Sequence, residues 1–307
     1  MLNVIKALAD PTRLRLIGIL EHGEFTVQDL VAILEMGQSR VSRHLRILVE
    51  AGICTVEKQG TWSYFKIDGK ADFFAAIKAE LIPRLSGIDG YHRDQIGLSR
   101  VLDERRRKSR QFFDQHARQW DRMVSELIPV EHYADHILRE LDPGHLVVDV
   151  GVGTGRLLND LSNSARYVVG IDQSSAMLDE ARARVNAGQL DNVELRLGEL
   201  THLPVADGYA DCVILNMVLH HAANPQDSLN ELCRVLKPGG KLIVADLIRH
   251  DMEWFQVQMA DQWMGFERRE MDRWLDAAGF RAGPYVQIKI DDSKPSVFVL
   301  TAEKIEI

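Results

Sequence analysis

The spacing of hydrophobic residues changes along the chain. In residues 1–90, apolar side chains mainly recur at intervals of three and four, which is typical of amphipathic helices. From residue 144 onward, short apolar runs alternate with helical patterns, which predicts a doubly wound parallel sheet covered by helices. We therefore expect an α/β protein of two domains.

Within the first 90 residues, the pattern predicts helices over about residues 11–21, 27–34 and 38–50. Asp10-Pro11 is a cap followed by the proline that favours a first helical position, and Thr26-Val27-Gln28-Asp29 has the spacing of a capping box. Two strand-like runs, Cys54–Lys58 and Thr61–Ile67, meet at Gln59-Gly60 and predict a hairpin.

The predicted helix over 38–50 has two distinct faces. Val41, Leu45 and Leu48 form its apolar side. A helix that follows a short helix and a turn, with a hairpin after it, is suited to enter the major groove of DNA. The predicted DNA contacts are the polar residues of this helix and a lysine of the hairpin: Gln38, Ser39, Arg40, Ser42, Arg43, Arg46 and Lys58.

Leu8–Arg15 and Ser39–Gly52 resemble the two most recognisable stretches of ArsR-type repressors. The resemblance covers about residues 1–90. It implies a winged helix-turn-helix that binds double-stranded operator DNA as a homodimer, paired through helices over about 1–9 and 72–87. Thr26-Val27-Gln28 stands where the thiolate sensors of that family carry Cys-Val-Cys, and the ligand pairs of its zinc sensors are absent from 72–90, so metal is not expected as the effector.

His132 and His136 have the spacing of two side chains on one helix face, but no third ligand accompanies them. We interpret them as surface or packing residues. The sequence thus predicts no metal site.

Residues 91–141 are interpreted as a helical linker and pocket lid, with helices over about 99–119 and 130–141. The charged run Asp103–Lys108 is interpreted as a solvated helix face, with contact to DNA phosphates as the alternative. Phe112–Asp121 resembles the segment that covers the cofactor in methyltransferases of the ubiquinone-biosynthesis type.

The stretch Leu146–Arg156 reads as a buried strand that ends in Asp149 and then passes through three alternate glycines into a helix. Loops of this kind, at the carboxyl end of a parallel strand, let the backbone approach a ligand closely. Arg156 stands where a dinucleotide-binding loop needs a small residue, so a dinucleotide is not favoured.

Further strands are predicted at Val168–Ile171, Val193–Leu197, Cys212–Leu215, Lys241–Ala245, Tyr285–Ile290 and Ser296–Thr301. The last two are expected to form an antiparallel edge. A helix is predicted from Pro225, stopped by Lys237–Gly240, and another over Met271–Gly279.

Asp149–Gly155, Gly170–Asp172 and Arg234–Gly240, in this order, are similar to class I methyltransferases that use S-adenosylmethionine (SAM). The resemblance spans about residues 110–305 and implies a domain over 142–307 that binds SAM or S-adenosylhomocysteine (SAH). Asp172 would accept hydrogen bonds from the ribose, and Glu199 with Leu200 would hold the adenine. The predicted cofactor-binding residues are Asp149, Gly151, Gly153, Thr154, Gly155, Asp172, Gln173, Glu199, Leu200, Asn216 and His221.

The net charge of −8 is unevenly distributed. Residues 1–90 carry 11 basic and 11 acidic side chains, so the remainder holds the whole acidic excess. No apolar run approaches the roughly 20 residues that span a bilayer, and no signal peptide is recognised, so we expect a cytoplasmic protein without a membrane partner. Three widely separated cysteines encode neither a disulfide framework nor a thiolate cage.

Two functions remain open from these residues. The first is a transcriptional regulator, similar to SAH-responsive ArsR-type repressors of the methionine cycle, in which SAM or SAH alters operator binding. The alternative is an active small-molecule methyltransferase with a fused DNA-binding domain; His220 and His221 could then deprotonate an acceptor, or simply form a pocket wall. No obligatory catalytic residue decides whether the chain is an enzyme.

Overall fold

A computed structural model describes residues 1–59, 62–67, 72–252, 254, 258–291 and 293–306. The chain divides into two compact units, Met1–Arg105 and Arg106–Ile307. The long helix α6, Tyr91–Ser125, contributes its first half to one unit and its second half to the other. No helix in the described ranges is both long and apolar enough to cross a membrane.

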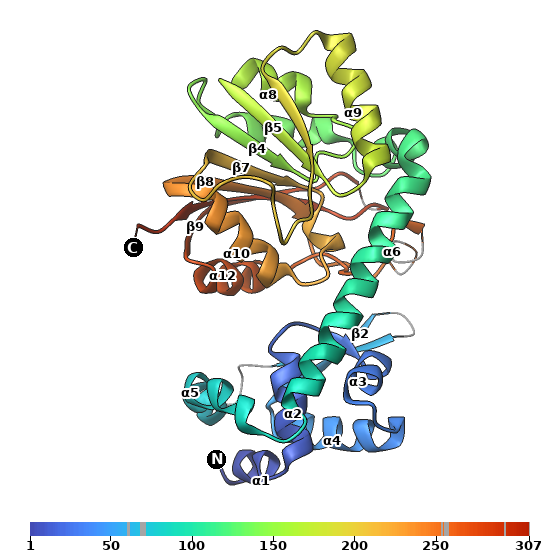
Figure 1. Ribbon diagram of the computed structural model, residues 1–307, viewed down its shortest axis with the longest axis vertical. Helices are drawn as coiled ribbons and strands as arrows, with labels where there is room; N and C mark the ends of the chain where they lie inside the picture. The colour runs from blue at the N-terminus through green and yellow to red at the C-terminus, as the bar shows by residue number, and fades with distance from the viewer. Residues whose placement is uncertain (60–61, 68–71, 253, 255–257, 292, 307) are drawn as a thin grey trace. The chain divides into compact units, whose positions relative to one another are not determined.

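The first unit is a helix-turn-helix (Figure 1). Its small antiparallel sheet has the strand order β1-β3-β2. The side chain of Asp10 caps α2 by accepting the Arg13 N–H, and Thr26 and Asp29 cap α3 reciprocally, as the sequence predicted. Gly60 and Thr61, predicted at the hairpin turn and strand start, lie outside the described residues. The elements are α1 (Leu2–Leu8), α2 (Pro11–Leu20), β1 (Phe25–Thr26), α3 (Val27–Leu34), α4 (Gln38–Glu50), β2 (Cys54–Gln59), β3 (Trp62–Ile67), α5 (Asp72–Leu81) and η1 (Ile82–Gly87).

Helix α6 begins eight residues before the predicted start near residue 99, and it continues through Gly97. A Cβ atom at position 97 would lie 2.6 Å from the carbonyl oxygen of Ile33. The glycine therefore allows α6 to pack closely against the end of α3, and the predicted helix start near residue 99 was wrong.

The prediction of one helix over 130–141 was also wrong. It is divided into η2 (Val130–His132) and α7 (Ala134–Leu138), because Tyr133 leaves the helical conformation with φ −135°. His132 and His136 thus belong to different elements and do not share one helix face.

The second unit is a seven-stranded sheet in the order β6-β5-β4-β7-β8-β10-β9. Its first five strands are parallel, and β10 runs antiparallel to both β8 and β9, which confirms the predicted antiparallel edge. The remaining elements are β4 (Leu146–Val150), α8 (Leu158–Ser164), β5 (Tyr167–Asp172), α9 (Ser175–Gly188), β6 (Val193–Leu197), β7 (Ala210–Asn216), η3 (Leu219–His221), α10 (Pro225–Val235), β8 (Leu236–Leu247), α12 (Arg268–Ala277), β9 (Phe280–Ile288) and β10 (Val297–Lys304).

Helices cover both faces of this sheet (Figure 1). Leu229 of α10 and Leu275 of α12 join alternate strand residues such as Val148 in one core. Leu161 of α8 and Leu178 of α9 pack in the other core, with the strand residues that point the opposite way. The sheet is therefore buried on both sides, as its continuous apolar strands predicted.

Strand β8 starts earlier than predicted. Pro238-Gly239-Gly240 was interpreted as the end of the preceding helix, but α10 ends at Val235 and β8 already includes these residues. The pairing of β7 with β8 shifts register between Ala210 and Cys212, so the glycines are accommodated at an irregular strand start.

Candidate ligand pocket and nucleic-acid interface

Helix α4 of the first unit separates its residues by polarity. Its N-cap is Gly37, and Val41, Leu45 and Leu48 are fully buried against the unit's core. All the predicted DNA-contacting residues of this helix are exposed, and Lys58 is exposed on β2: Gln38, Ser39, Arg40, Ser42, Arg43, Arg46 and Lys58. This face offers basic and hydrogen-bonding side chains without an acidic residue among them.

In the second unit, the glycine loop lies between β4 and α8. Gly151 has φ +72° and Gly155 has φ +80°, which other residues rarely adopt. A Cβ atom at Gly151 would lie 2.3 Å from a methyl carbon of Val218, and one at Gly155 would lie 2.7 Å from Leu158. Gly153, in contrast, has open space beside it and lines a pocket.

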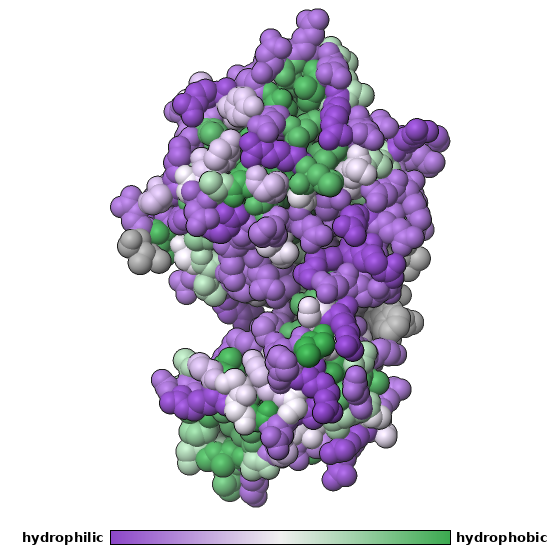
Figure 2. Space-filling model, viewed as in Figure 1, coloured by the Kyte–Doolittle hydropathy of each residue, from purple (hydrophilic) through white to green (hydrophobic). Residues whose placement is uncertain are grey.

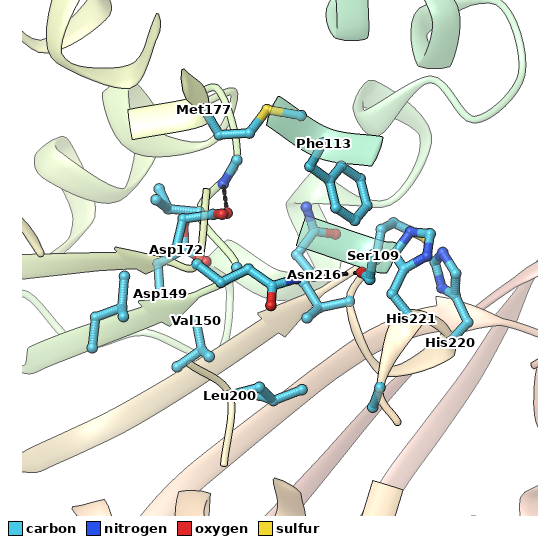
Figure 3. A pocket seen from close by; sticks show the side chains of 18 of the residues that line it. Ser109, Phe113, Asp149, Val150, Asp172, Met177, Leu200, Asn216, His220 and His221 are labelled. Carbon is cyan, nitrogen blue, oxygen red and sulfur yellow. Dashed lines mark hydrogen bonds between the residues drawn. The ribbon is translucent and has the colours of Figure 1, made fainter. Parts of the chain in front are cut away.

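The ends of β4, β5 and β7 bring three polar side chains to this pocket. These are Asp149, Asp172 and Asn216 (Figure 3). The Oδ2 atom of Asp172 accepts the Gly153 N–H at 2.8 Å, and its Oδ1 atom accepts the Ser174 N–H at 2.8 Å. Each oxygen retains a lone pair, so Asp172 can accept further hydrogen bonds from a pair of hydroxyl groups.

Both buried carboxyl groups have raised pKa values. Burial raises the pKa of Asp172 to about 6, although the backbone N–H groups of Ser174 and Gly153 oppose this shift. Burial, and then the nearby charge of Asp172, raise the pKa of Asp149 to about 7. A ligand that donates hydrogen bonds to Asp172 would favour its ionised form.

The second half of α6 is bound to the residues around the glycine loop. Thr154 donates a hydrogen bond to Asp121 at 2.5 Å, and Ser174 donates one to Asp114 at 2.6 Å. Gln173 donates to the Ser109 hydroxyl at 3.3 Å (Figure 3). This half of the helix thus supplies one wall of the pocket.

The charged run 103–108 is not a simple solvated face. Arg105 forms an ion pair with Asp29 at 2.9 Å and lies over the Phe25 ring within the first unit. Arg106 lines the pocket of the second unit. The interpretation of these two arginines as solvated was wrong, because each contacts a separate part of the protein.

At the other end of the pocket, η3 presents His220 and His221 side by side, with ring centroids 4.0 Å apart (Figure 3). Phe113 of α6 contacts His221 edge-on, at 4.8 Å between centroids. His220 Nδ1 donates to Asp246 Oδ1 at 2.7 Å. Asp261 lies 3.7 Å from His220 Nε2 and 3.6 Å from His221 Nδ1.

These buried groups have strongly shifted pKa values. Burial lowers the pKa of His220, but the carboxylates of Asp246 and Asp261 outweigh it and raise the pKa to about 9. Burial, and then the charge of His220, lower the pKa of His221. Burial raises the pKa of Asp261 to about 7, against the effect of His220.

The structure brings the predicted cofactor residues together around this pocket, with the exception of Gly155, which packs on Leu158 instead. Glu199 lies 3.5 Å from Arg110 of α6. Sequence reasoning missed several lining residues: Arg106, Ser109, Trp120, Tyr133, Met259 and Asp261. The resemblance of Phe112–Asp121 to a cofactor-covering segment was the signal for Trp120, whereas Arg106, Ser109 and Asp261 lie outside that segment and had none.

Two family models match separate parts of the chain. Residues 10–56 match the model of bacterial regulatory proteins of the arsR family, and residues 148–244 match a methyltransferase domain. The first match contains α4, and the second contains the glycine loop, Asp172 and the two histidines.

Curated relatives match the chain over part of their length. An arsenite methyltransferase of Halobacterium salinarum is 35% identical over 149 residues, which cover 46% of this chain and 38% of the relative. A demethylmenaquinone methyltransferase of Renibacterium salmoninarum is 31% identical over 163 residues, covering 53% and 60%. An uncharacterized 37.1 kDa protein in a Streptomyces fradiae transposon is 39% identical over 119 residues, covering 37% and 34%. The matched region thus spans between about one third and three fifths of these relatives.

Solved structures match the second unit. A SAM-dependent methyltransferase from Aquifex aeolicus superposes with a TM-score of 0.52 at 25% identity, covering 62% of this chain and 98% of that chain. A chain from the complex between the Haloferax volcanii Trm112 methyltransferase activator and a methyltransferase superposes with a TM-score of 0.55 at 22% identity. The match covers 63% of this chain and 98% of that chain. The protein therefore joins an arsR-type helix-turn-helix domain to a domain with the class I methyltransferase fold.

Proposed function

We propose that this protein is a DNA-binding transcriptional regulator that senses SAH or SAM in its methyltransferase-like domain and changes its operator affinity in response. In this proposal residues 1–90 form the DNA-binding and dimerisation domain, 91–141 the linker and lid, and 142–307 the sensor. The observation that carries the proposal is α6, which belongs to both units.

The pocket fits a nucleoside that carries an amino acid. Asp172 has free lone pairs for ribose hydroxyls. Leu200 and Glu199 line the same pocket and would offer an adenine ring an apolar face and a hydrogen-bond acceptor. Asn216 Oδ1 is buried and accepts no hydrogen bond from any part of the chain that the structure describes. An ammonium group of the ligand would satisfy this oxygen.

Helix α6 offers a route by which ligand binding would reach the DNA-binding unit. Asp94, in its first turns, pairs with Arg15 of α2, and Arg105 pairs with Asp29 of α3. Farther along the same helix, Ser109 and Phe113 line the pocket. A ligand that moves or orders residues 109–121 would therefore act on a helix anchored to the DNA-binding unit.

A homodimer is part of the proposal because operators of this repressor type are palindromic. Hydrophobic side chains gather over the region of α1 in the first unit (Figure 2). Met1, Leu2 and Ile5 are 76%, 61% and 45% exposed, which is unusual for residues of their size. This surface supports pairing through α1.

Methyl transfer is the second candidate, and one observation favours it. Beyond the residues suited to the nucleoside, the pocket continues along apolar side chains such as Trp120, Val130 and Met259, which leaves room for an acceptor. SAM would supply an electrophilic methyl group, so the chain would mainly have to hold the acceptor in line. Phe113 and His221 would then bound the acceptor.

The deciding experiment is calorimetric titration of the full-length protein with SAM and SAH separately. Each titration is repeated with duplex DNA selected by the protein from a random pool. Binding of SAH that changes in the presence of DNA supports the regulator, since coupling between two ligands must be reciprocal. Binding of SAM without any effect of DNA, together with transfer of a labelled methyl group, would contradict it and support the enzyme.

A further inference from the structure

The carboxylate of Asp261 is buried without the hydrogen bonds that such a group needs. Its side chain has no exposed surface, and neither oxygen accepts a hydrogen bond from a residue that the structure describes. Both imidazoles of η3 face it, at 3.6 and 3.7 Å from Oδ1. These separations are too long for hydrogen bonds, so the carboxylate is directed at two nitrogen atoms that it does not reach.

We infer that His220, His221 and Asp261 form a binding site for one divalent transition-metal ion, of which Zn²⁺ is the probe. One ligand atom from each residue lies within 4.8 Å of the other two. The inference does not depend on whether the pocket senses a nucleoside or supports methyl transfer. The sequence predicted no metal site because Asp261 follows His221 by forty residues, without a motif that connects them.

The orientation of His220 suits metal binding. Its Nδ1 atom donates to Asp246, so Nε2, the atom that faces Asp261, is the nitrogen that can bind a metal ion in place of its proton. Asp246 is itself held by the backbone N–H groups of Leu219 and Leu247, at 2.9 and 2.7 Å. A carboxylate that orients a ligand histidine in this way is a common feature of metal sites.

His221 can also turn its lone pair toward the site. The contact of its Nδ1 atom with the carbonyl oxygen of Ala260 is 3.4 Å, longer than a normal N–H···O hydrogen bond. That contact fixes the nitrogen only weakly. A proton on Nε2 would leave Nδ1 free to bind the ion.

The two nitrogen-to-oxygen distances agree with coordination after a small contraction, and all three ligand atoms lie within 4.8 Å of one another. Bonds of about 2.0 to 2.2 Å at tetrahedral angles place two ligand atoms about 3.4 Å apart. The observed nitrogen-to-oxygen separations exceed this value by a few tenths of an ångström. Backbone hydrogen bonds from Gln262 and Trp263 to the carbonyl oxygen of His220 already hold the two segments together.

The ligand atoms of this site favour zinc and other divalent first-row transition metals over magnesium or calcium. Two imidazoles and one carboxylate suit borderline ions, whereas Mg²⁺ and Ca²⁺ prefer oxygen ligands. All three residues line the pocket, so a fourth coordination position would face its interior. Water or an oxygen atom of a pocket ligand would fill that position.

The test is titration of the full-length, chelator-treated protein with ZnCl₂, in the native form and as Asp261→Asn. His221→Gln is a second variant, for the case in which Asp261→Asn does not fold by circular dichroism. The matched control is the double variant His132→Ala/His136→Ala, which removes two histidines outside the cluster. X-ray absorption at the zinc edge reports the ligand atoms directly.

We expect one Zn²⁺ per native chain, with two nitrogen ligands and a carboxylate oxygen at about 2.0 to 2.2 Å. Affinity should fall at least tenfold in the folded variant of the cluster and stay unchanged in the control, and Mg²⁺ should not compete. Absence of stoichiometric Zn²⁺ binding, equal affinity in the cluster variant, or loss of binding in the control would each overturn the inference.

Discussion

Arg15 of α2 and Asp94 of α6 form a two-pronged ion pair, with Nε to Oδ2 at 2.6 Å and Nη2 to Oδ1 at 2.5 Å. The Asp94 side chain is 2% exposed and that of Arg15 is 16% exposed. The hydrogen bond with Asp94 raises the pKa of Arg15, so the guanidinium group is charged at neutral pH. This pair anchors the start of α6 to the helix-turn-helix.

Arg15→Ala should destabilise the first unit by about 2 to 4 kcal/mol, because it leaves the Asp94 carboxylate buried without its cation. Urea unfolding followed by circular dichroism measures the change. Arg84→Ala is the matched control, since the Arg84–Glu80 pair is exposed on both sides and should contribute little. Equal effects of the two substitutions would contradict the anchoring role.

Asp172→Asn should weaken SAH binding by about 30- to 150-fold, which corresponds to about 2 to 3 kcal/mol for lost hydrogen bonds to a charged acceptor. DNA binding of the ligand-free protein should be unchanged. Calorimetry measures the first property and fluorescence anisotropy the second. Asp179→Asn, at an exposed position of α9, is the control and should keep native affinity.

Asp149→Asn should stabilise the ligand-free protein at pH 8, and the gain should shrink toward pH 4. The folded-state pKa of about 7 lies above the value of about 3.9 for an unfolded aspartate. The stability from this group is therefore fully present below about pH 3.9 and is lost as pH rises through 7. Urea unfolding at both pH values tests the sign.

Asp211 supplies the opposite case. Burial raises its pKa, but the hydrogen bonds from Lys237 and from the Leu146 N–H outweigh this effect, and the net pKa is lowered. Its contribution is present above the unfolded pKa and is lost as pH falls through the folded pKa. Asp211→Asn should destabilise the protein at pH 8 more than at low pH; the same pH trend for both variants would refute the assignment.

Arg43→Ala should weaken binding to pool-selected duplex DNA by about ten- to a hundredfold, because an exposed arginine of a recognition helix contacts bases or phosphates. SAH affinity without DNA should be unchanged. Fluorescence anisotropy at two salt concentrations separates the two kinds of contact, since a lost phosphate contact also reduces the salt dependence. Arg84→Ala again serves as the control, and an equal loss there would indicate a nonspecific charge effect.

The double variant Arg107→Gly/Lys108→Gly should keep both binding activities but reduce the coupling between them. Two glycines destabilise a helix by about 2 kcal/mol, which is comparable to typical coupling free energies of 1 to 3 kcal/mol. Both side chains are exposed. The control is therefore Arg107→Ala/Lys108→Ala, which removes the same charges without lowering the stability of the helix. The ratio of SAH affinities with and without DNA should approach one in the glycine variant only.

Local signals in the sequence were sufficient for most elements. The caps at Asp10, Thr26 and Asn224 mark helix starts that the structure places at Pro11, Val27 and Pro225. The positions of the strands along the chain followed from apolar runs and glycine turns, because these depend on neighbouring residues.

The errors arose where distant contacts override local preference. Gly97 favours a loop by propensity, yet the backbone of Ile33 requires a residue without a Cβ atom there. Pro238-Gly239-Gly240 favours a helix end, yet these residues form an irregular part of β8, between Leu236 and Lys241, which both pair with β7. Asp261 meets the histidines only because its segment folds back onto η3, which no local pattern indicates.

The continuity of α6 also bears on how such proteins could be recombined or engineered. An α-helix turns about 100° per residue, so each inserted or deleted residue between Arg105 and Ser109 would rotate one half of the helix against the other. In the proposed regulator, exchange of the second unit at this point should preserve the ligand response only in chimaeric proteins that keep the helical phase. Joining points that differ by seven residues, about two full turns, should therefore be the first to regain a ligand response.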